Sequence, residues 1–172
     1  PGSIFGYPYL VTKVRFPLPL LPAVIVGVAG VQMALSLVIA VGFAAFRGLS
    51  WEVLWLPVSV LPLICYGLAL AWQLGSISVY LRDIVHLAPS VSSLLMFLTP
   101  IFYPSSMVPE GMRWLVELNP LAWTAECVRG LLMHGTSPDW LGWVSHFGVA
   151  LASMAFALWF FRRVQPGFSD VL

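Results

Sequence analysis

Polar and aromatic side chains recur at helical spacing within stretches of the sequence that are otherwise apolar. One set is spaced by seven residues and therefore shares one face of a helix: Ser59, Tyr66, Gln73 and Tyr80. A second set is spaced by four, three and four residues: Ser92, Met96, Thr99 and Tyr103. In lipid, such groups turn toward protein or water, so they indicate either contacts between helices or the wall of a conduit.

A conduit wall of this composition suits sugars. The C–H faces of a sugar stack on aromatic rings, and its hydroxyls need hydrogen-bonding partners but no fixed charge. On this interpretation the pathway candidates are Tyr66, Gln73, Tyr80, Thr99, Phe102 and Tyr103. Simple helix–helix contact is the competing interpretation of the same pattern.

The remaining residues form no motif that is typical of an enzyme. Lys13 is the only lysine and no glycine-rich loop precedes it, so the sequence contains no phosphate-binding P-loop. The three histidines lack the spacing of metal ligands, and no serine lies in a nucleophile elbow. Cys65 and Cys127 are too few for a disulfide framework. The sequence therefore predicts no catalytic residue, no metal and no cofactor bound by this chain.

The elements that position these side chains follow from composition. The chain has 172 residues, of which 60% are hydrophobic and only 9% charged, against about 25% charged in a typical soluble domain. Its mean hydropathy is +0.93. A net charge of +1 offers no basic field for nucleic acid. These values exclude a soluble enzyme and predict an all-α polytopic membrane protein.

Four stretches contain no Asp, Glu, Lys or Arg, and each is long enough for a helix to cross a membrane, which takes roughly 20 residues. We expect the transmembrane helices at residues 18–46, 53–81, 87–104 and 140–161. Residues 1–17 precede the first of them. If the start of the chain is cytoplasmic, five basic residues lie inside and three outside, which fits the positive-inside rule and also places the C-terminus inside.

The segment 105–136, between the third and fourth spans, carries two short amphipathic patterns. Glu110, Arg113 and Glu117 are at helical spacing, and Asn119-Pro120 is typical of a helix start. Glu126 and Arg129 can pair within the second helix, and Gly135 is a plausible stop. Two interpretations stand: a re-entrant helical pair that caps a pathway from outside, or an interfacial hairpin without a gating role.

Four motifs in order resemble the permease subunit of polysaccharide and O-antigen ABC exporters, with capsule and teichoic-acid exporter permeases as relatives. They are PYLVTKVRFPLPLLP (8–22), YLRDIVHL (80–87), LTPIFYPSSMVP (98–109) and LNPLAWTAECVRGLLMHG (118–135). The resemblance covers essentially the whole chain. Family members have six spans, and the motifs correspond to spans three to six. We therefore expect two further spans N-terminal to this chain.

The resemblance implies a transport subunit of the bacterial cytoplasmic membrane, not an enzyme. Its implied partners are a separate ATP-binding subunit that uses the ATP, a second permease copy, membrane lipid and a lipid-linked polysaccharide. Residues 1–17 resemble the cytoplasmic coupling segment that rests on the ATP-binding subunit. The coupling candidates are Tyr9, Lys13, Arg15, Phe16, Arg82 and Asp83. Topological anchoring by Lys13 and Arg15, and a solvated turn at Arg82-Asp83, are the competing interpretations.

Two other functions stay open at the level of sequence. An ABC exporter of drugs or small lipids would share the fold. A membrane-embedded transferase would need a polar catalytic cluster in or beside the spans, and the sequence shows none.

Overall fold

The computed structural model describes residues 18–46, 48, 50–81, 83–101, 103 and 107–170. Secondary structure within these ranges is helical, with no strand. The elements, in chain order, are α2 (Leu20–Ala45), the 3-10 helix η1 (Trp51–Trp55), α3 (Leu56–Ser59), α4 (Leu61–Tyr80), α5 (Ile84–Leu98), the 3-10 helix η3 (Glu110–Met112), α6 (Arg113–Glu117), α7 (Pro120–Arg129), the π-helix η4 (Gly130–His134), α8 (Trp140–Val164) and the 3-10 helix η5 (Gln165–Asp170).

Three helices within the described residues are long and apolar enough to cross a membrane. They run over Leu20–Ala45, Trp51–Tyr80 and Trp140–Phe168, with 26, 30 and 29 residues. At a rise of about 1.5 Å per residue, each exceeds the roughly 30 Å of a hydrocarbon core. The fourth apolar helix, α5, is shorter. This architecture confirms the predicted all-α polytopic membrane fold.

The helix α5 differs from the span expected at 87–104, because it covers Ile84–Leu98 and has only 15 residues. It ends early because Pro100 disfavours helical backbone at the preceding residue. Thr99 accordingly has φ −88° and ψ 128°, which is extended. At about 1.5 Å per residue, α5 reaches roughly 22 Å, which is less than a full crossing.

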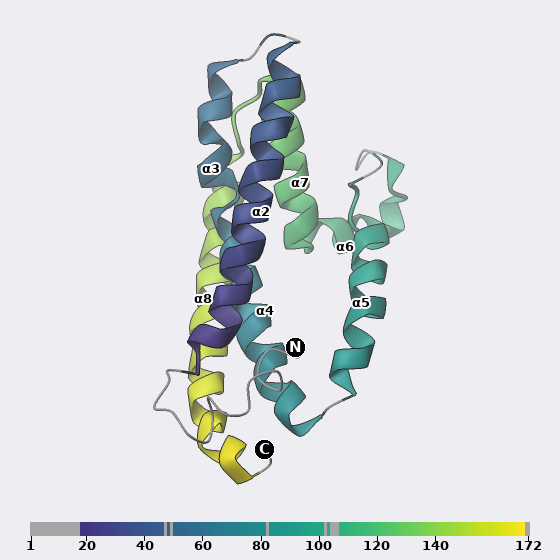
Figure 1. Ribbon diagram of the computed structural model, residues 1–172. Coiled ribbons are helices and arrows are strands. Elements are labelled where there is room, and N and C mark those ends of the chain that lie inside the picture. Colours follow the sequence, from purple (N-terminus) through teal and green to yellow (C-terminus); the bar gives the residue numbers. More distant parts are fainter. Residues whose placement is uncertain are drawn as a thin grey trace.

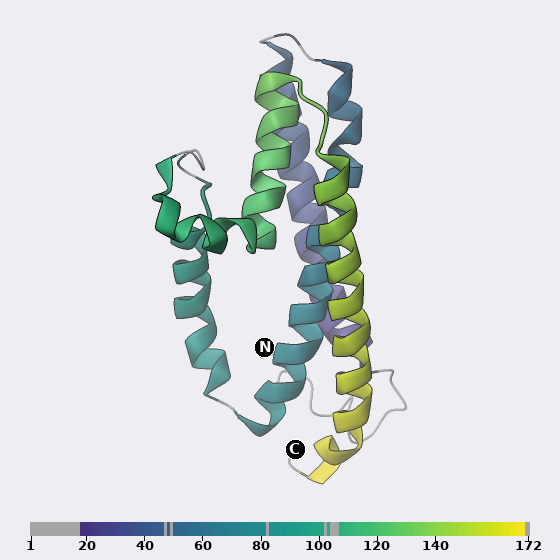
Figure 2. The same cartoon turned by 180° about the vertical axis from the view of Figure 1, so that it is seen from behind.

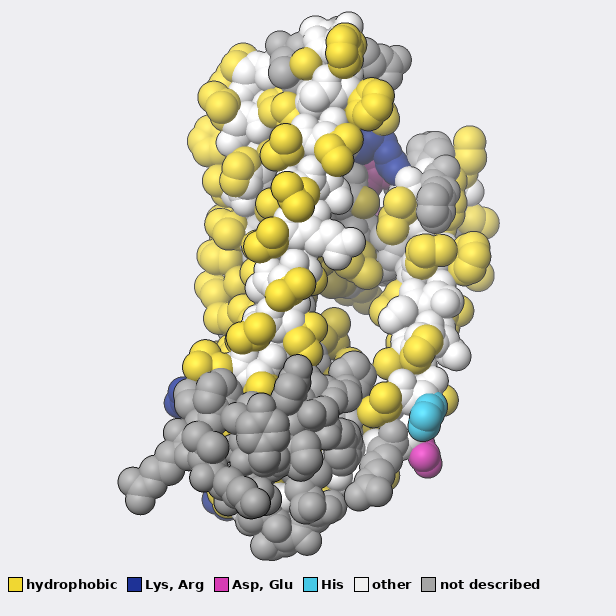
Figure 3. Space-filling model, viewed as in Figure 1, with side chains coloured by type: hydrophobic (Ala, Val, Ile, Leu, Met, Phe, Trp, Pro, Cys, Tyr) yellow, Lys and Arg dark blue, Asp and Glu magenta, His cyan; other side chains and the backbone are white. Residues whose placement is uncertain are grey.

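The long helices form a column from which α5 stands apart (Figures 1 and 2). The helix α2 runs antiparallel to α4 and α8, which pack along each other. None of the residues of α5 is buried. Hydrophobic side chains cover the visible face of α2, and a hollow separates this column from α5 (Figure 3). The helix α7 lies beside the half of the column where α2 ends (Figure 1). The helix α5 stands alongside the other half, where α2 begins.

A break between α3 and α4 exposes a backbone carbonyl that joins α3 to α8, near the end of the column where α2 ends. Pro62 has no N–H, so it cannot donate to the carbonyl of Val58 four residues earlier. The indole Nε1 of Trp143 in α8 donates to this carbonyl instead, at 2.9 Å. The ring of Trp143 stacks on Phe147 with centroids 4.8 Å apart. The proline break therefore creates an acceptor that fixes α8 against α3.

Gly135 ends η4 with a positive φ of 59°, and a Cβ there would lie 2.9 Å from the Cβ of Ser50. We expect Gly135→Ala to lower the free energy of unfolding by about 2 kcal/mol, because left-handed strain and a steric clash add. Gly48 also has a positive φ, of 90°, but open space around its Cα. Thermal unfolding in detergent should show about half the loss for Gly48→Ala, which carries strain alone. Equal losses for the two variants would rule out the clash.

Candidate functional site

The helices before α8 are built by local signals that the sequence shows. Asn119 caps α7, since its Oδ1 accepts a hydrogen bond from the backbone N–H of Leu121 at 3.0 Å. Pro120 occupies the first turn, where its missing N–H costs nothing. Gly135 follows η4 in the left-handed conformation. The cap, the proline start and the glycine stop are therefore confirmed.

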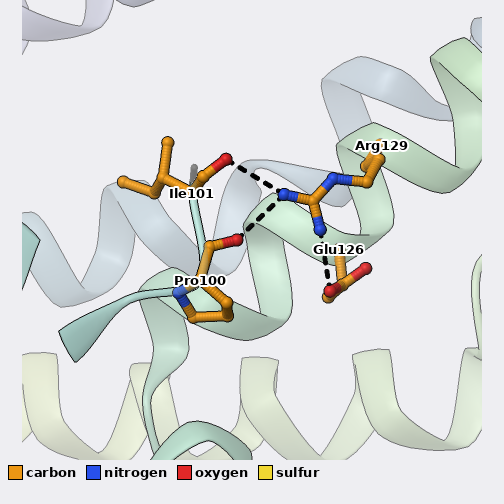
Figure 4. Close-up of polar contacts among 4 residues, drawn as sticks. All are labelled: Pro100, Ile101, Glu126 and Arg129. Carbon is orange, nitrogen blue, oxygen red and sulfur yellow. Dashed lines mark hydrogen bonds and ion pairs between the residues drawn. The ribbon is translucent and has the colours of Figure 1, made fainter. Parts of the chain in front are cut away.

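Arg129 holds the chain that leaves α5 (Figure 4). Its Nη2 donates to the carbonyls of Pro100 and Ile101, at 2.9 and 3.1 Å. Its Nη1 lies 2.8 Å from Oε1 of Glu126, which confirms the predicted ion pair. The two carbonyls lie beyond the last turn of α5 and have no place in its helical ladder. The planar guanidinium serves these three acceptors from two nitrogens held in one fixed fork, a geometry that the single nitrogen of a lysine does not provide.

A second polar contact lies beside it. Nδ2 of Asn119 donates to Oγ1 of Thr99 at 2.9 Å, and this hydroxyl donates in turn to the carbonyl of Leu95 at 2.7 Å. Thr99 is fully buried and Asn119 is 9% exposed. The same Asn119 side chain thus starts α7 with its oxygen and holds the end of α5 with its nitrogen.

We call these contacts the outer clamp, after the outer side on which the sequence predicts the segment 105–136. The clamp is formed by Thr99, Pro100, Ile101, Asn119, Glu126 and Arg129. Irregular backbone at membrane depth is tolerated only where protein or water satisfies its polar groups. The outer clamp meets this need, because side chains from α7 satisfy the backbone after α5. It also fixes α7 to the end of a helix that otherwise stands apart. The arrangement is suited to positioning rather than to acid–base chemistry.

The structure does not bring the predicted pathway residues into one cluster. Tyr66 and Gln73 are half-buried on α4, and Tyr80 is exposed at its end, where its hydroxyl lies 3.3 Å from the carbonyl of Val164. Thr99 belongs to the outer clamp. Tyr103 is half-buried, and its hydroxyl donates to the carbonyl of Phe97 at 3.1 Å. The sixth candidate, Phe102, lies outside the described residues.

Of the predicted coupling residues, the structure describes Asp83. It is exposed and precedes α5 as the N-cap, with no hydrogen bond from its side chain to the helix. Five coupling candidates lie outside the described residues: Tyr9, Lys13, Arg15, Phe16 and Arg82. Their roles stay predictions.

Two cavities flank the helices that follow α5. One, of about 370 Å³, lies between the end of α5 and α6, and its largely apolar lining includes Phe97, Tyr103 and Met112. The other, of about 230 Å³, lies between α7 and residues 135–139 and includes Cys127 and Asp139. The carboxylate of Asp139 already accepts from two backbone N–H groups at the start of α8. No group of three or more possible metal ligands occurs among the described residues.

The second cavity has a measurable consequence for Cys127. Burial, together with the negative charges of Asp139 and Glu126, raises the pKa of this thiol from 9.0 to about 11. Below pH 9, we therefore expect about a hundredfold less thiolate than for an unperturbed thiol, because each pKa unit is tenfold. Alkylation by iodoacetamide at pH 8 should slow accordingly, and its rate should rise about tenfold per pH unit up to pH 10. A rate equal to that of a free cysteine peptide would contradict this expectation.

The sequence pattern did not predict the two bonds from Arg129 to backbone carbonyls or the contact between Asn119 and Thr99. A signal for the first was present. Pro100 ends a helix within an apolar region, and the carbonyls that follow this helix end require a donor. Arg129 is one of few donors nearby in the sequence. No sequence signal identified Thr99 as the partner of Asn119, because that pairing depends on how α7 returns to α5.

Comparison with known proteins shows the family to which this chain belongs. The model of the ABC-2 type transporter family matches residues 5–133, three quarters of the chain. The chain belongs to the ABC-2 type transporter family. The match runs from before α2 to the end of η4, so it includes the outer clamp of this ABC-2 type chain.

Two curated proteins are similar in sequence to this ABC-2 type chain. The O-antigen export system permease protein RfbA of Myxococcus xanthus is 31% identical over 134 residues, which are 76% of this chain and 52% of that protein. A protein of the same name from Klebsiella pneumoniae is 22% identical over 178 residues, 99% of this chain and 68% of that protein. The chain thus spans about half to two thirds of these relatives. The resemblance drawn from the four sequence motifs is confirmed.

Proposed function

We propose that this chain is part of the membrane subunit of an ATP-driven exporter. In this proposal the transporter moves lipid-linked polysaccharide of the O-antigen type across the bacterial cytoplasmic membrane. A separate ATP-binding subunit hydrolyses the ATP, and two copies of the permease enclose the pathway. The chain itself binds no cofactor.

The similarity to an O-antigen export permease, within an ABC-2 family match, carries this proposal. The structure supports it in two ways. Three helices can cross a membrane, as a permease requires. The described polar residues of the outer clamp bond to one another, which suits a subunit that moves a substrate without reacting with it.

The parts of the chain divide the work in this proposal. Residues 1–17, with Arg82 and Asp83, receive movement from the ATP-binding subunit on the cytoplasmic side. Tyr66, Gln73, Tyr80 and Tyr103 contribute to the wall of the pathway, with Phe102. The outer clamp, which includes Thr99, holds the helices between α5 and α8 in place at the outer end. The start of α2 and the end of α8 lie at the same end of the column, which is cytoplasmic in this orientation (Figure 1).

The test uses the full permease that contains this chain, expressed with its candidate ATP-binding subunit. We expect the two to copurify in detergent. Loss of the permease should remove O-antigen from the cell surface and leave lipid-linked polymer on the cytoplasmic side. Unchanged surface O-antigen together with increased drug sensitivity would contradict the proposed substrate and favour a drug exporter. Absence of any copurifying ATPase would contradict the transporter itself.

A further inference from the structure

The start of α2 is fixed to the side of α4 by a long-range hydrogen bond. The indole Nε1 of Trp72 donates to the carbonyl of Pro19 at 2.8 Å, across 53 residues of sequence. Pro19 is the N-cap of α2, two residues beyond the segment 1–17. Trp72 is 9% exposed and Leu18 is 6% exposed. The chain therefore enters its first long helix through a point that is held by α4.

The backbone at this point is stiff. Pro19 and Pro22 each have a fixed φ, and Pro22 is fully buried in the first turn of α2. A pull on the preceding residues is therefore transmitted through the bond to Trp72 and is not absorbed by local rotation of the chain. A flexible connection rich in glycine would absorb the same displacement by rotating its backbone and would not pass it on to α4.

The contact continues from α4 into α8. Trp72 shares a buried cluster with Val79 of α4 and Phe161 of α8, and the latter two are fully buried. Phe168 of η5 folds back onto the same cluster and lies edge-on to Phe161, with ring centroids 5.6 Å apart. Because close-packed side chains transmit displacement, a shift of α2 at this end is expected to carry α4 and α8 with it.

We propose that Trp72 is a positioning residue that transmits movement of the segment before α2 into α4 and α8 during export. The proposal rests on the proposed function, because it needs an ATP-driven movement at residues 1–17. It adds the mechanical step by which that movement reaches the transmembrane helices. Trp72 acts through its hydrogen bond to Pro19 and does not touch the polymer.

The chain offers a matched control. Trp143 makes the same kind of bond, from its indole Nε1 to the carbonyl of Val58 at 2.9 Å, and joins α8 to α3 near the outer end. W72F and W143F each remove one indole donor and keep an aromatic ring. A merely structural role would give both variants the same effect.

The experiment measures ATP hydrolysis and polymer translocation by the assembled transporter in proteoliposomes. W72F should lower the polymer moved per ATP about tenfold, the equivalent of one well-placed hydrogen bond, while copurification with the ATP-binding subunit is unchanged. W143F should keep this ratio within about twofold. If W72F does not assemble, 3-benzothienylalanine at position 72 removes the N–H in an isosteric ring and is read by the same two measurements.

An unchanged ratio for the position-72 variant in a working transporter overturns the inference alone, and so does an equal fall for W143F. A native transporter that neither hydrolyses ATP nor moves polymer contradicts the proposed function, and the inference falls with it. The native measurement thus separates the two failures.

Discussion

Exchange of Arg129 for methionine is expected to lower the free energy of unfolding by about 4 kcal/mol, the largest effect of any single substitution considered. The Arg129 side chain is 21% exposed, and its guanidinium makes three hydrogen bonds, two of them to the carbonyls of Pro100 and Ile101. Methionine fills a similar volume but donates nothing. The two carbonyls then lose their donor, and α7 is released from the end of α5. Thermal or denaturant unfolding in detergent measures the loss.

Arg113 supplies the matched control for this prediction. It lies on α6, is exposed and has no ion pair among the described residues. Arg113→Met removes the same charge from a neighbouring helix and should change stability by about 0.5 kcal/mol or less. Arg129→Lys should recover less than half of the lost stability, since an ammonium lacks the guanidinium fork. Similar losses for Arg129→Met and Arg113→Met would show that charge, and not the outer clamp, sets the stability.

Replacement of Asn119 by alanine is expected to cost about 3 kcal/mol, because one side chain fills two roles. Its oxygen caps α7 through Leu121 N–H, and its nitrogen donates to the buried hydroxyl of Thr99. The variant Asn119→Asp separates the two. An aspartate still caps the helix, but it cannot donate to Thr99. Asn119→Asp should therefore lose about half as much free energy of unfolding as Asn119→Ala.

A double-mutant cycle measures the contact itself. Thr99→Val removes the hydroxyl at nearly constant volume, and it is combined with Asn119→Ala. We expect a coupling of about 1 kcal/mol between the two positions, within the range for directly bonded residues. If the two losses of stability are strictly additive, the hydrogen bond of 2.9 Å between Nδ2 of Asn119 and Oγ1 of Thr99 contributes nothing to stability. The same variants, assayed for surface O-antigen, link the outer clamp to the proposed export.

The helices could largely be predicted from sequence, because hydropathy and length act locally. Stretches free of charge gave three spanning helices close to their observed bounds, including Leu20–Ala45 against the expected 18–46. The local signals at Asn119, Pro120 and Gly135 also held, since caps and turns depend on neighbouring residues alone. The span expected at 87–104 was too long, because it ran past Leu98 and ignored the backbone restriction that Pro100 places on Thr99.

The candidate site was less accessible to sequence reasoning. Spacing by seven puts Tyr66, Gln73 and Tyr80 on one face of α4, while Ser59 lies in α3 beyond the break. Spacing cannot tell which neighbour that face meets. The hydroxyl of Tyr80 lies near the carbonyl of Val164 at the end of α8, and the hydroxyl of Thr99 accepts a hydrogen bond from Asn119. The pathway roles of all six candidates stay predictions: Tyr66, Gln73, Tyr80, Thr99, Phe102 and Tyr103. The coupling roles at Tyr9, Lys13, Arg15 and Phe16 also stay predictions, because these residues lie outside the described part of the chain.

The sequence by itself determined that this is an all-α membrane protein that resembles ABC exporter permeases, because 9% charge and four ordered motifs are properties of the linear chain. Only the tertiary structure decided that Arg129 serves Pro100 and Ile101, and that Trp72 holds Pro19. In each case the acceptor is a backbone carbonyl at or next to a proline that borders a helix. Local sequence shows that such a carbonyl needs a donor, but only the packing of distant helices decides which side chain reaches it.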